Sequence, residues 1–545
     1  MARRRSDVPT LVSRIEPTSS AFTTYREEML ARVTELRAIE RKSRDTEQQA
    51  REKFQQRGQL LPRERLALLL DRGSPFLELS TLCGYKHHDD TDGSLAGGNT
   101  IVGIGFVSGV RCLVFVNNSA VKGGTATPWG VQKSLRAQEI ALENRLPVVS
   151  LVESGGANLL YQQEIFVPGG ETFYNQAKLS AAGIPQVTVV HGSSTAGGAY
   201  IPGLSDHVVM VRGKAKVFLA GPPLLRAATG EVATDEELGG AEMHATVAGT
   251  ADHLAEDDAD GIRIAREIVA SLGWNDAFPP PTRSAIEPPR YPVEELCGVV
   301  PIDHRRPYDC REVIARLVDG SDFAPFKDDY DALTVCGWAR IEGRSIGIIG
   351  NNGPITPKGA TKAGQFIQLC CQTQKPIVYL QNTTGYMVGT QSEQGGIVKH
   401  GAKMLQAVAN ATVPQVTILL GGAFGAGNYG MCGRAFHPRF IFAWPNARTA
   451  VMGGEQAAKV LSIVSAEKAR RAGQPVDEAA LAWMAQPLIE QFERESDAFH
   501  CSARLFDDGV IDPRDTRRVL GFILATCEEA ARRTLAPNTF GVARL

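Results

Sequence analysis

The chain carries the same sequence pattern twice at a fixed spacing, and this repeat constrains its fold more than any other feature. Pro147 and Pro185 each begin an apolar run in the first half, and their positions differ by 185 − 147 = 38. Pro376 and Pro414 begin similar runs in the second half at the same separation, so the copies are offset by 376 − 147 = 229 along the sequence. Self-similarity at a fixed offset indicates a duplicated domain.

The repeat also sets the expected number of domains. A chain of 545 residues corresponds to about three or four average domains, or to two large ones, and the duplication favours two. A segment with six prolines, 277–292, lies between the copies and is typical of a linker. We expect an N-terminal helical extension (1–58), an N-terminal domain (59–280) and a C-terminal domain (281–545).

Each copy predicts the order strand, strand, helix, strand, glycine turn, helix, strand, glycine turn, helix. The strand runs are short, β-branched and apolar nearly throughout, which is typical of strands covered on both faces. Residues 22–57 predict a solvated helix with one apolar stripe, formed by Leu30, Val33, Leu36 and Ile39. Residues 60–79 predict a second helix that stops at Gly73, and residues 99–118 a hairpin followed by another strand. The fold class is therefore α/β, with binding sites expected at strand ends.

Composition excludes several classes of protein. Hydrophobic residues make up 43% and charged residues 22% of the chain, as in an ordinary globular protein. The net charge of 58 − 60 = −2 provides no positive field for nucleic acid. The most apolar stretch, 101–116, is interrupted by polar residues and is too short to span a bilayer. We therefore expect neither a nucleic acid nor a membrane as partner.

Ten cysteines without a Cys-x-x-Cys pair do not suggest a disulfide scaffold or a zinc knuckle. We expect them, including the adjacent Cys370 and Cys371, to be reduced and buried. The first residues lack the apolar segment of a secretory signal, and the arginines at 3–5 fit either a transit peptide or a plain polar N-terminus. We expect a cytoplasmic protein, with the mitochondrial matrix as the alternative.

Glycine is enriched, at 55 of 545 residues or 10% against about 7% on average, and it gathers in four strand-to-helix turns. Such turns present backbone N–H groups beyond the sheet edge and allow a ligand close to the backbone. Two chemistries use this arrangement, namely phosphate binding and oxyanion stabilisation. The turns contain no Walker-type lysine, and no acidic residue is spaced for a ribose, so four matched turns favour oxyanion sites over tight packing alone. The turns are residues 154–158, 193–200, 382–386 and 421–429.

Other polar clusters leave alternatives open. The segment 87–92, with two histidines and three aspartates, suggests a metal site or, preferably, an exposed polar loop. Ser193 and Ser194 do not lie in a Gly-x-Ser-x-Gly motif, which argues against a hydrolase triad. Glu231 is either a base or part of a segment explained by a helix cap at Thr234. Three basic residues either meet anionic groups or form a solvated helix face; they are Lys122, Lys133 and Arg136.

Several long segments resemble the carboxyltransferase (beta) subunit of biotin-dependent acyl-CoA carboxylases. The similarity extends from about Arg57 to the end of the chain. The segments are SGGAN (154–158), FYNQAKLSAAGIPQ (173–186), GSSTAGGAYIPGLSD (192–206), FLAGPPLLRAATGE (218–231) and FGAGNYGM (424–431). The resemblance implies two tandem crotonase-like domains, each a ββα superhelix, in agreement with the repeat. It also implies that residues 59–280 form the acyl-CoA side and residues 281–545 the biotin side.

Within this family, Asn158 and the FGAGNYGM segment resemble the methylcrotonyl-CoA and geranyl-CoA branch. Residues 166–173 read FVPGGETF and are shorter than the methylcrotonyl pattern, with Gly169 and Gly170 in place of bulk. Loss of bulk near the acyl pocket leaves room for a longer chain. We therefore expect geranyl-CoA as substrate, otherwise 3-methylcrotonyl-CoA, with a propionyl-CoA or acetyl-CoA carboxylase subunit as the alternative.

The resemblance also implies the site residues. The N–H groups of Gly156 and Ala157 hold the thioester oxygen when the γ-carbon is deprotonated, and those of Ala426 and Gly427 hold the ureido oxygen of biotin. The other expected acyl-CoA-binding residues are Ser154, Gly155, Asn158, Gly169, Gly170, Thr195, Ala196, Gly197 and Gly198. The other expected biotin-binding residues are Gly385, Tyr386, Phe424, Gly425 and Asn428, and no metal site is expected.

The sequence lacks a Met-Lys-Met biotinylation site and an ATP-binding glycine loop. The resemblance therefore implies an alpha partner that contains biotin carboxylase and biotin carboxyl carrier parts and uses ATP and bicarbonate. It further implies a homo-oligomeric beta core, a hexamer within an alpha6beta6 complex, with the active site between chains. Two functions of other classes remain as alternatives, namely a biotin-independent crotonase-type hydratase or isomerase, and a non-catalytic scaffold.

Overall fold

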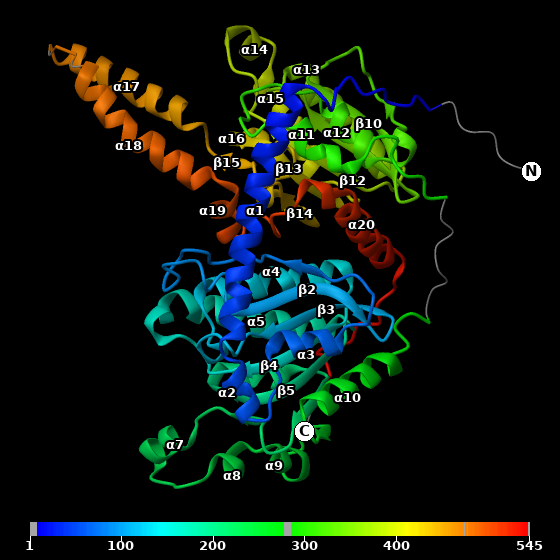
Figure 1. Ribbon diagram of the computed structural model, residues 1–545, viewed down its shortest axis with the longest axis vertical. Coiled ribbons are helices and arrows are strands. Elements are labelled where there is room, and N and C mark those ends of the chain that lie inside the picture. Colours follow the sequence, from blue (N-terminus) through cyan, green and yellow to red (C-terminus); the bar gives the residue numbers. More distant parts are fainter. Residues whose placement is uncertain (1–7, 277–284, 474, 477, 543–545) are drawn as a thin grey trace, which may run out of the picture. The chain divides into compact units, whose positions relative to one another are not determined.

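The computed structural model describes residues 8–276, 285–473, 475–476 and 478–542, and its chain divides into two compact units (Figure 1). The N unit comprises residues 37–281, 503–505 and 525–545, and the C unit comprises residues 1–36, 282–502 and 506–524. Both ends of the chain thus join the unit built by the other half. The division into 1–58, 59–280 and 281–545 remains a prediction, and part of the proline-rich segment lies outside the described residues.

The N unit contains a sheet of eight strands in the order β1-β2-β3-β4-β5-β6-β8, with β7 paired to β5. Strands β1, β2 and β3 are antiparallel neighbours, and the remaining pairs are parallel. The strands are β1 Leu77–Leu79, β2 Thr100–Val107, β3 Val110–Asn117, β4 Val148–Ser154, β5 Gln186–Thr195, β6 His207–Val211, β7 Lys216–Phe218 and β8 His253–Ala255. The helices are α2 Arg51–Gln56, α3 Pro62–Leu69, η1 Lys122–Gly124, α4 Pro128–Asn144, η2 Leu159–Tyr161, α5 Gln162–Ala181, η3 Ala196–Ala199, α6 Tyr200–Leu204, α7 Pro222–Thr229, α8 Asp235–Gly239, α9 Ala241–Thr246 and α10 Asp258–Ser271.

The C unit contains a second sheet in the order β14-β13-β12-β11-β10-β9, with β15 paired to β13. Its strands are β9 Ala324–Pro325, β10 Thr334–Ile341, β11 Arg344–Asn351, β12 Ile377–Thr383, β13 Gln415–Phe424, β14 Phe440–Ala443 and β15 Arg448–Ala450. Its helices are η4 Val293–Glu295, α11 Leu296–Val299, α12 Cys310–Leu317, η5 Asp319–Ser321, α13 Pro357–Gln372, α14 Thr390–Gln394, α15 Ile397–Ala409, α16 Gly425–Gly430, η6 Arg434–Phe436, α17 Gly454–Arg471, α18 Glu478–Ser496, α19 Ala498–Ala503 and η7 Pro513–Asp515. Helices α1 Ser20–Gln48 and α20 Thr516–Arg532 contribute residues to both units.

The two sheets repeat each other in detail. The first positions of β12 and β4 differ by 377 − 148 = 229, and those of β13 and β5 differ by the same amount, 415 − 186 = 229. The register between β4 and β5 shifts between Val152 and Ser154, and the register between β12 and β13 shifts at the matching positions, Gln381 and Thr383. The predicted duplication and the predicted order of strands, turns and helices are therefore confirmed.

Local sequence explains why the repeated elements form. Thr127 caps α4 by accepting a hydrogen bond from the Gly130 N–H at 3.1 Å, and Thr356 caps α13 by accepting one from the Gly359 N–H at 2.9 Å. A proline at the first helical position follows each cap, where its missing N–H costs nothing. Every residue of β4 and of β13 is buried, as expected for parallel strands covered on both faces.

Three expected elements differ from the structure. The single helix expected over 22–57 is two helices, α1 and α2, and Met29 rather than Leu30 lies fully buried on its stripe. Helix α3 ends at Leu69 instead of continuing to Gly73, because Asp71 bonds to the turn between β2 and β3. Residues 99–118 contain only the hairpin of β2 and β3.

Nine of the ten cysteines are buried and Cys371 is half-buried. Over the described part of the chain, no helix is both long enough and apolar enough to span a membrane.

A buried carboxyl group in the C unit leads to a pH-dependent stability prediction. Asp507 is buried, and its Oδ1 accepts hydrogen bonds from Ser502 Oγ at 2.7 Å and from the Gly509 N–H at 2.9 Å. Burial raises the pKa of Asp507 to about 7. Between its ordinary pKa and pH 7 the unfolded state loses this proton while the folded state keeps it, so the folded state loses stability as the pH rises through this range.

We expect Asp507→Asn to remove this pH dependence, because the amide keeps the Oδ1 acceptor and carries no charge. The melting temperature of the variant minus that of the unmodified protein should therefore be several degrees larger at pH 8 than at pH 5. Thermal unfolding at both pH values measures this difference. Asp508→Asn, which removes an ion pair with Arg434 at 2.8 Å, is the matched control and should lower the melting temperature instead. An unchanged difference for Asp507→Asn at the two pH values would contradict the prediction.

Candidate functional site

In the N unit, the turn after β4 contacts the turn after β5. Gly156 has a φ of +85°, which favours glycine, and a Cβ added there would lie 3.5 Å from the Thr195 carbonyl oxygen. A Cβ added at Gly198 would lie 3.4 Å from the Ser154 Cβ. We call residues 154–158 the acyl turn. Together with η3 it forms one continuous surface of backbone at the sheet edge.

The hydrogen bonds of the acyl turn determine which N–H groups can meet a ligand. The Gly156 N–H donates to Ser154 Oγ at 3.2 Å. The Asn158 N–H donates to the Ala126 carbonyl, and the Ala126 N–H donates to the Gly156 carbonyl. In this parallel bridge, Ala157 turns its own N–H away from Ala126. In the 3-10 helix η3, whose N-cap is Thr195, the first i→i+3 bond runs from the Gly198 N–H, so the Gly197 N–H before it has no partner within that helix.

A cavity of about 600 Å³ opens beside these groups and lies within the range of small-molecule pockets, about 300–1,000 Å³. Its walls come from β4, α4, α5 and η3. Seven of the predicted acyl-CoA-side residues line it; they are Ser154, Gly156, Ala157, Gly169, Gly170, Gly197 and Gly198. The lining does not include the predicted residues Gly155, Asn158, Thr195 and Ala196.

The inner part of the cavity is mainly apolar. Val148, Val152 and Phe115 contribute from the sheet, and Ile165 and Leu179 from α5. Gly169 and Gly170 lie in the middle of α5, and a Cβ added at Gly170 would meet no atom within 4 Å. The absence of side chains at these two positions keeps this wall of the cavity open.

The C unit repeats the arrangement of the two turns. Gly385 has a φ of +125°, and its N–H donates to Thr383 Oγ1 at 3.2 Å, as the Gly156 N–H does to Ser154. A Cβ added at Gly427 would lie 2.7 Å from the Gly385 Cα, so glycine is required there. Ala426 matches Gly197, since 426 − 197 = 229. The two predicted pairs of backbone donors therefore occupy different positions of the repeat, because Gly156 matches Gly385 instead.

The side chains predicted to bind biotin are packed inside the C unit. The Tyr386 ring lies 3.2 Å from the position of a Cβ at Gly401, and burial raises the pKa of Tyr386 to about 12. Phe424 packs against the ring of His304, with ring centroids 5.1 Å apart. The Asn428 side chain lies against Gly433. Phe424 and Asn428 are buried, so these two residues offer a ligand mainly their backbone, whereas the Tyr386 side chain is half-buried.

Comparison with known proteins shows the family to which the chain belongs. The profile described as the carboxyl transferase domain matches residues 53–542. A Mycobacterium tuberculosis protein named as a probable biotin-dependent acyl-coenzyme A carboxylase beta2 subunit is 53% identical over 490 residues, covering 90% of this chain and 91% of that protein. The chain belongs to the carboxyl transferase family. It is the carboxyltransferase (beta) type of subunit of biotin-dependent acyl-CoA carboxylases, as the sequence predicted.

Two further similar proteins are subunits of a 3-methylcrotonyl-coenzyme A carboxylase and of a geranyl-CoA carboxylase. The biotin-dependent 3-methylcrotonyl-coenzyme A carboxylase beta1 subunit of Mycobacterium tuberculosis is 49% identical, over 89% of this carboxyltransferase and 91% of that protein. The crystal structure of the P. aeruginosa geranyl-CoA carboxylase beta subunit matches with a TM-score of 0.93 and 60% identity, covering 98% of this chain and 100% of that one. The predicted α/β fold class, with two tandem crotonase-like domains, is confirmed.

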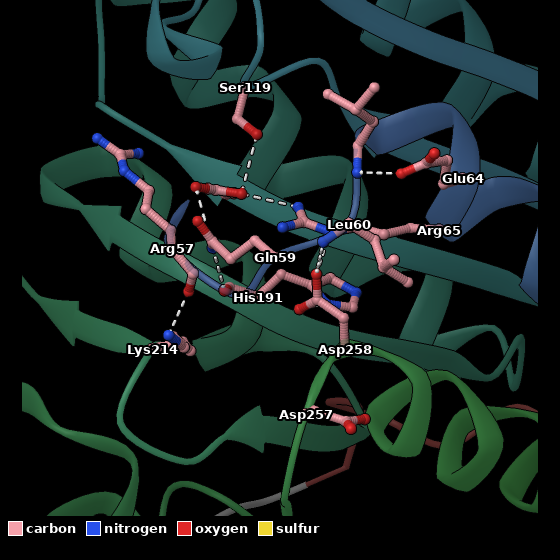
Figure 2. A network of polar contacts seen from close by, with 12 residues as sticks. Arg57, Gln59, Leu60, Glu64, Arg65, Ser119, His191, Lys214, Asp257 and Asp258 are labelled. Atoms are coloured by element: carbon pink, nitrogen blue, oxygen red, sulfur yellow. Dashed lines mark hydrogen bonds and ion pairs between the residues drawn. The ribbon is translucent and has the colours of Figure 1, made fainter. Parts of the chain in front are cut away.

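A buried ionic network that the sequence pattern did not reveal lies directly behind the acyl turn of this carboxyltransferase (Figure 2). Arg65 forms ion pairs with Glu153 at 2.7 Å and with Asp258 at 2.9 Å, and it is 1% exposed. His191 Nδ1 lies 2.8 Å from Asp258 Oδ1. The available signal was a single glutamate and a single histidine, each within an otherwise apolar strand run. The partners on α3 and α10 carry no such signal.

The structure shows the contacts of the 87–92 loop and of Lys133, two of the polar candidates from the sequence. In the 87–92 loop, Asp89 pairs with Lys122 at 2.6 Å, and His88 pairs with Glu164 at 3.0 Å. Among the described residues, no group of three or more His, Cys, Asp or Glu side chains is placed to hold a metal ion. Lys133 is 2% exposed and donates to the Thr100 carbonyl at 2.7 Å, so a solvated face is wrong for this residue.

The segment around Glu231 contains the helix cap that its sequence suggested. Thr234 caps α8, and its side chain and that of Glu237 form a reciprocal capping box. Glu231 itself is exposed. The cap therefore explains the acidic residues of this segment without a catalytic base.

Proposed function

We propose that this carboxyltransferase transfers a carboxyl group to the γ-carbon of geranyl-CoA, with 3-methylcrotonyl-CoA as the shorter alternative. The cavity of about 600 Å³, with two glycines in its α5 wall, carries this proposal because it offers an apolar space for a long acyl tail. The 60% identity to a geranyl-CoA carboxylase beta subunit, against 49% to a 3-methylcrotonyl-coenzyme A carboxylase subunit, supports the same choice.

The backbone donors at the acyl turn stabilise the charge of the reaction. Deprotonation of the γ-carbon moves negative charge through the conjugated double bond onto the thioester oxygen. Because the Gly156 N–H is held by Ser154, we assign this role to Ala157 together with Gly197, in place of the pair Gly156 and Ala157. One such donor contributes about 3 kcal/mol in a site that excludes water.

The C unit suits the other half of the transfer. Biotin, carried by a partner subunit, supplies the carboxyl group when it is bound there. The close contact of Gly427 with Gly385 leaves a cradle that any Cβ would fill, and the N–H groups of Ala426 and Gly427 begin a helical turn there. We assign these two groups to the ureido oxygen, with Gly385, Tyr386, Phe424, Gly425 and Asn428 forming the surrounding backbone. The acyl-CoA side then corresponds to residues 59–280 and the biotin side to 281–545.

We also infer that the working form is a hetero-oligomer with a beta core, an alpha6beta6 complex by the family resemblance. Leu159, Leu160 and Phe166 lie on η2 and α5 beside the cavity, and each is more than 80% exposed. Exposed apolar groups of this size at a site are typical of a surface that a second chain covers. A co-purified complex that runs as single beta chains on size measurement would contradict this. The cytoplasm, or otherwise the mitochondrial matrix, remains the predicted location.

The test of the proposed function is an assay of the chain with its biotin-carrying partner on three thioesters. We expect kcat/KM to be highest for geranyl-CoA, lower for 3-methylcrotonyl-CoA and lowest for propionyl-CoA. A clear preference for propionyl-CoA would contradict the assignment to the methylcrotonyl-CoA and geranyl-CoA branch. Hydration of crotonyl-CoA by the chain alone, without biotin, would support a hydratase instead.

A further inference from the structure

Glu153 is a charged residue at the buried end of β4, immediately before the acyl turn. The register shift between β4 and β5 falls between Val152 and Ser154, so Glu153 has no partner in the strand ladder. Side chains alternate along a strand, and Ser154 lines the cavity, so Glu153 points to the opposite face of the sheet. Strand β4, which lines the cavity on one face of the sheet, thus carries a carboxylate on the opposite face at its end.

The Glu153 carboxylate connects four segments of the N unit. Its Oε2 accepts hydrogen bonds from Arg65 Nη1 at 2.7 Å and from Ser119 Oγ at 2.9 Å. Gln59 Nε2 lies 3.4 Å from its Oε1 and donates to the His191 carbonyl on β5 at 2.9 Å. The side chain therefore connects the end of β4 to α3, to the loop after β3 and, through Gln59, to the strand that leads to η3.

A second carboxylate holds Arg65 from the other side. Asp258 accepts hydrogen bonds from Arg65 Nε at 2.9 Å and from the Leu60 N–H at 2.7 Å. Burial lowers the pKa of His191, so its neutral ring donates Nδ1–H to Asp258. Burial alone would raise the pKa of Asp258, but the bond from His191 and the charge of Arg65 lower it to about 2. A buried array of this kind adds little net stability compared with apolar packing, although removal of one member is costly.

The described residues of the C unit repeat the fold without this network. The position that matches Glu153 is Asn382, since 153 + 229 = 382, and the position that matches His191 is Leu420. Asn382 Oδ1 accepts a hydrogen bond from the Gly422 N–H at 2.9 Å. The strands β12 and β13 thus carry a neutral amide and a leucine where β4 and β5 carry a glutamate and a histidine. The ionic network is therefore not a requirement of the repeated fold and belongs to the acyl side alone.

We propose that Glu153, held by Arg65 and Ser119, is a positioning residue that fixes the acyl turn for catalysis. Its side chain lies flat against β5, where a Cβ added at Gly192 would lie 2.7 Å from the Glu153 Cδ. The end of β4 and the strand that leads to Gly197 are thereby held at one separation, which aligns the Ala157 and Gly197 donors. This inference rests on the proposed function, because it assigns the thioester oxygen to those donors.

The test is Glu153→Gln in the complete complex with the biotin-carrying partner. The amide keeps the shape of the side chain but weakens its bonds to Arg65 and Ser119. We expect kcat for geranyl-CoA carboxylation to fall about tenfold, because a small displacement of donors from the reacting atom is costly. The slow decarboxylation of carboxybiotin in the absence of acyl-CoA, which reports on the biotin side of this chain, should stay unchanged. Ser119→Ala should lower kcat in the same direction by roughly twofold, because it removes only one bond.

Glu78→Gln is the matched control. Glu78 pairs with Arg63 on the same helix α3 through two contacts of 2.8 and 3.0 Å, but it lies on β1 at the sheet edge. It should lose comparable thermal stability and keep kcat. Equal kcat in the two variants, or losses of kcat that follow the melting temperature in both, would overturn the proposal. An unmodified complex that carboxylates no acyl-CoA would instead contradict the proposed function.

Discussion

A Gly170→Phe variant is expected to lose about 10³-fold in kcat/KM for geranyl-CoA and to retain most of its activity on 3-methylcrotonyl-CoA. Gly170 lines the cavity, and a side chain added there enters open space without displacing protein atoms. Geranyl-CoA is one isoprene unit longer than 3-methylcrotonyl-CoA. Exclusion of about five apolar carbon groups, at about 0.8 kcal/mol each, costs about 4 kcal/mol, which corresponds to about 10³-fold.

Steady-state kinetics on both thioesters measures this change in specificity. Gly170→Ala is the matched control, because its methyl group fills little of the cavity and alanine favours the helix interior. Gly169→Phe provides a second variant from the same wall, since Gly169 also lines the cavity. Loss of both activities to the same extent in Gly170→Phe would indicate damage to α5, and an unchanged preference for geranyl-CoA would show that the acyl tail lies elsewhere.

The second large effect is expected from removing single backbone donors at the two sites. Gly197→Pro and Ala426→Pro each delete one N–H at the second position of a helical turn, where that N–H makes no bond within the helix. A Cβ at Gly197 would lie 3.5 Å from Phe173, an ordinary contact, and Ala426 already carries one. We expect each variant to lose about 10²- to 10³-fold in kcat, the usual cost of one oxyanion donor.

The two proline variants should differ in which partial reaction they lose. Gly197→Pro should keep the slow decarboxylation of carboxybiotin in the absence of acyl-CoA, whereas Ala426→Pro should lose it, because only the latter changes the biotin side of this chain. Gly197→Ala and Ala426→Gly retain the N–H and serve as controls for shape. If the alanine and glycine variants lose as much kcat as the proline variants, the N–H groups are not the donors. Gly156→Pro would be uninformative, because a φ of +85° is closed to proline.

Much of the fold could be predicted because the repeat is encoded in local pattern. The prolines before the strands, the threonine caps before α4 and α13 and the apolar strand runs recur at one offset, and each acts over a few residues. The end of α3 could not be predicted, because Leu70 is a good helix residue. Asp71 ends the helix by bonding to Ser108 and Gly109, which are distant in sequence.

In the candidate site, too, some features could be predicted from local sequence and others depend on contacts between distant residues. The glycine turns could be predicted from the sequence, and seven of the predicted acyl-side residues line one cavity. The choice of donors within the turns did not follow, because the direction of an N–H depends on which neighbour accepts its bond. Ser154 holds the Gly156 N–H, and the bridge to Ala126 turns the Ala157 N–H away from that strand.

The carboxyltransferase activity was implied by the resemblance of long segments to a known family. The pattern of the sequence by itself determined a duplicated α/β fold with glycine turns at two sets of strand ends. Those features depend on local spacing and composition, which the chain carries without its partners in space. Only the tertiary structure decided the volume of the acyl cavity and the network of Arg65, Glu153 and Asp258 behind it. Residues from α3, β4 and α10 meet there because the sheet and its covering helices pack together, and no spacing along the chain records that contact.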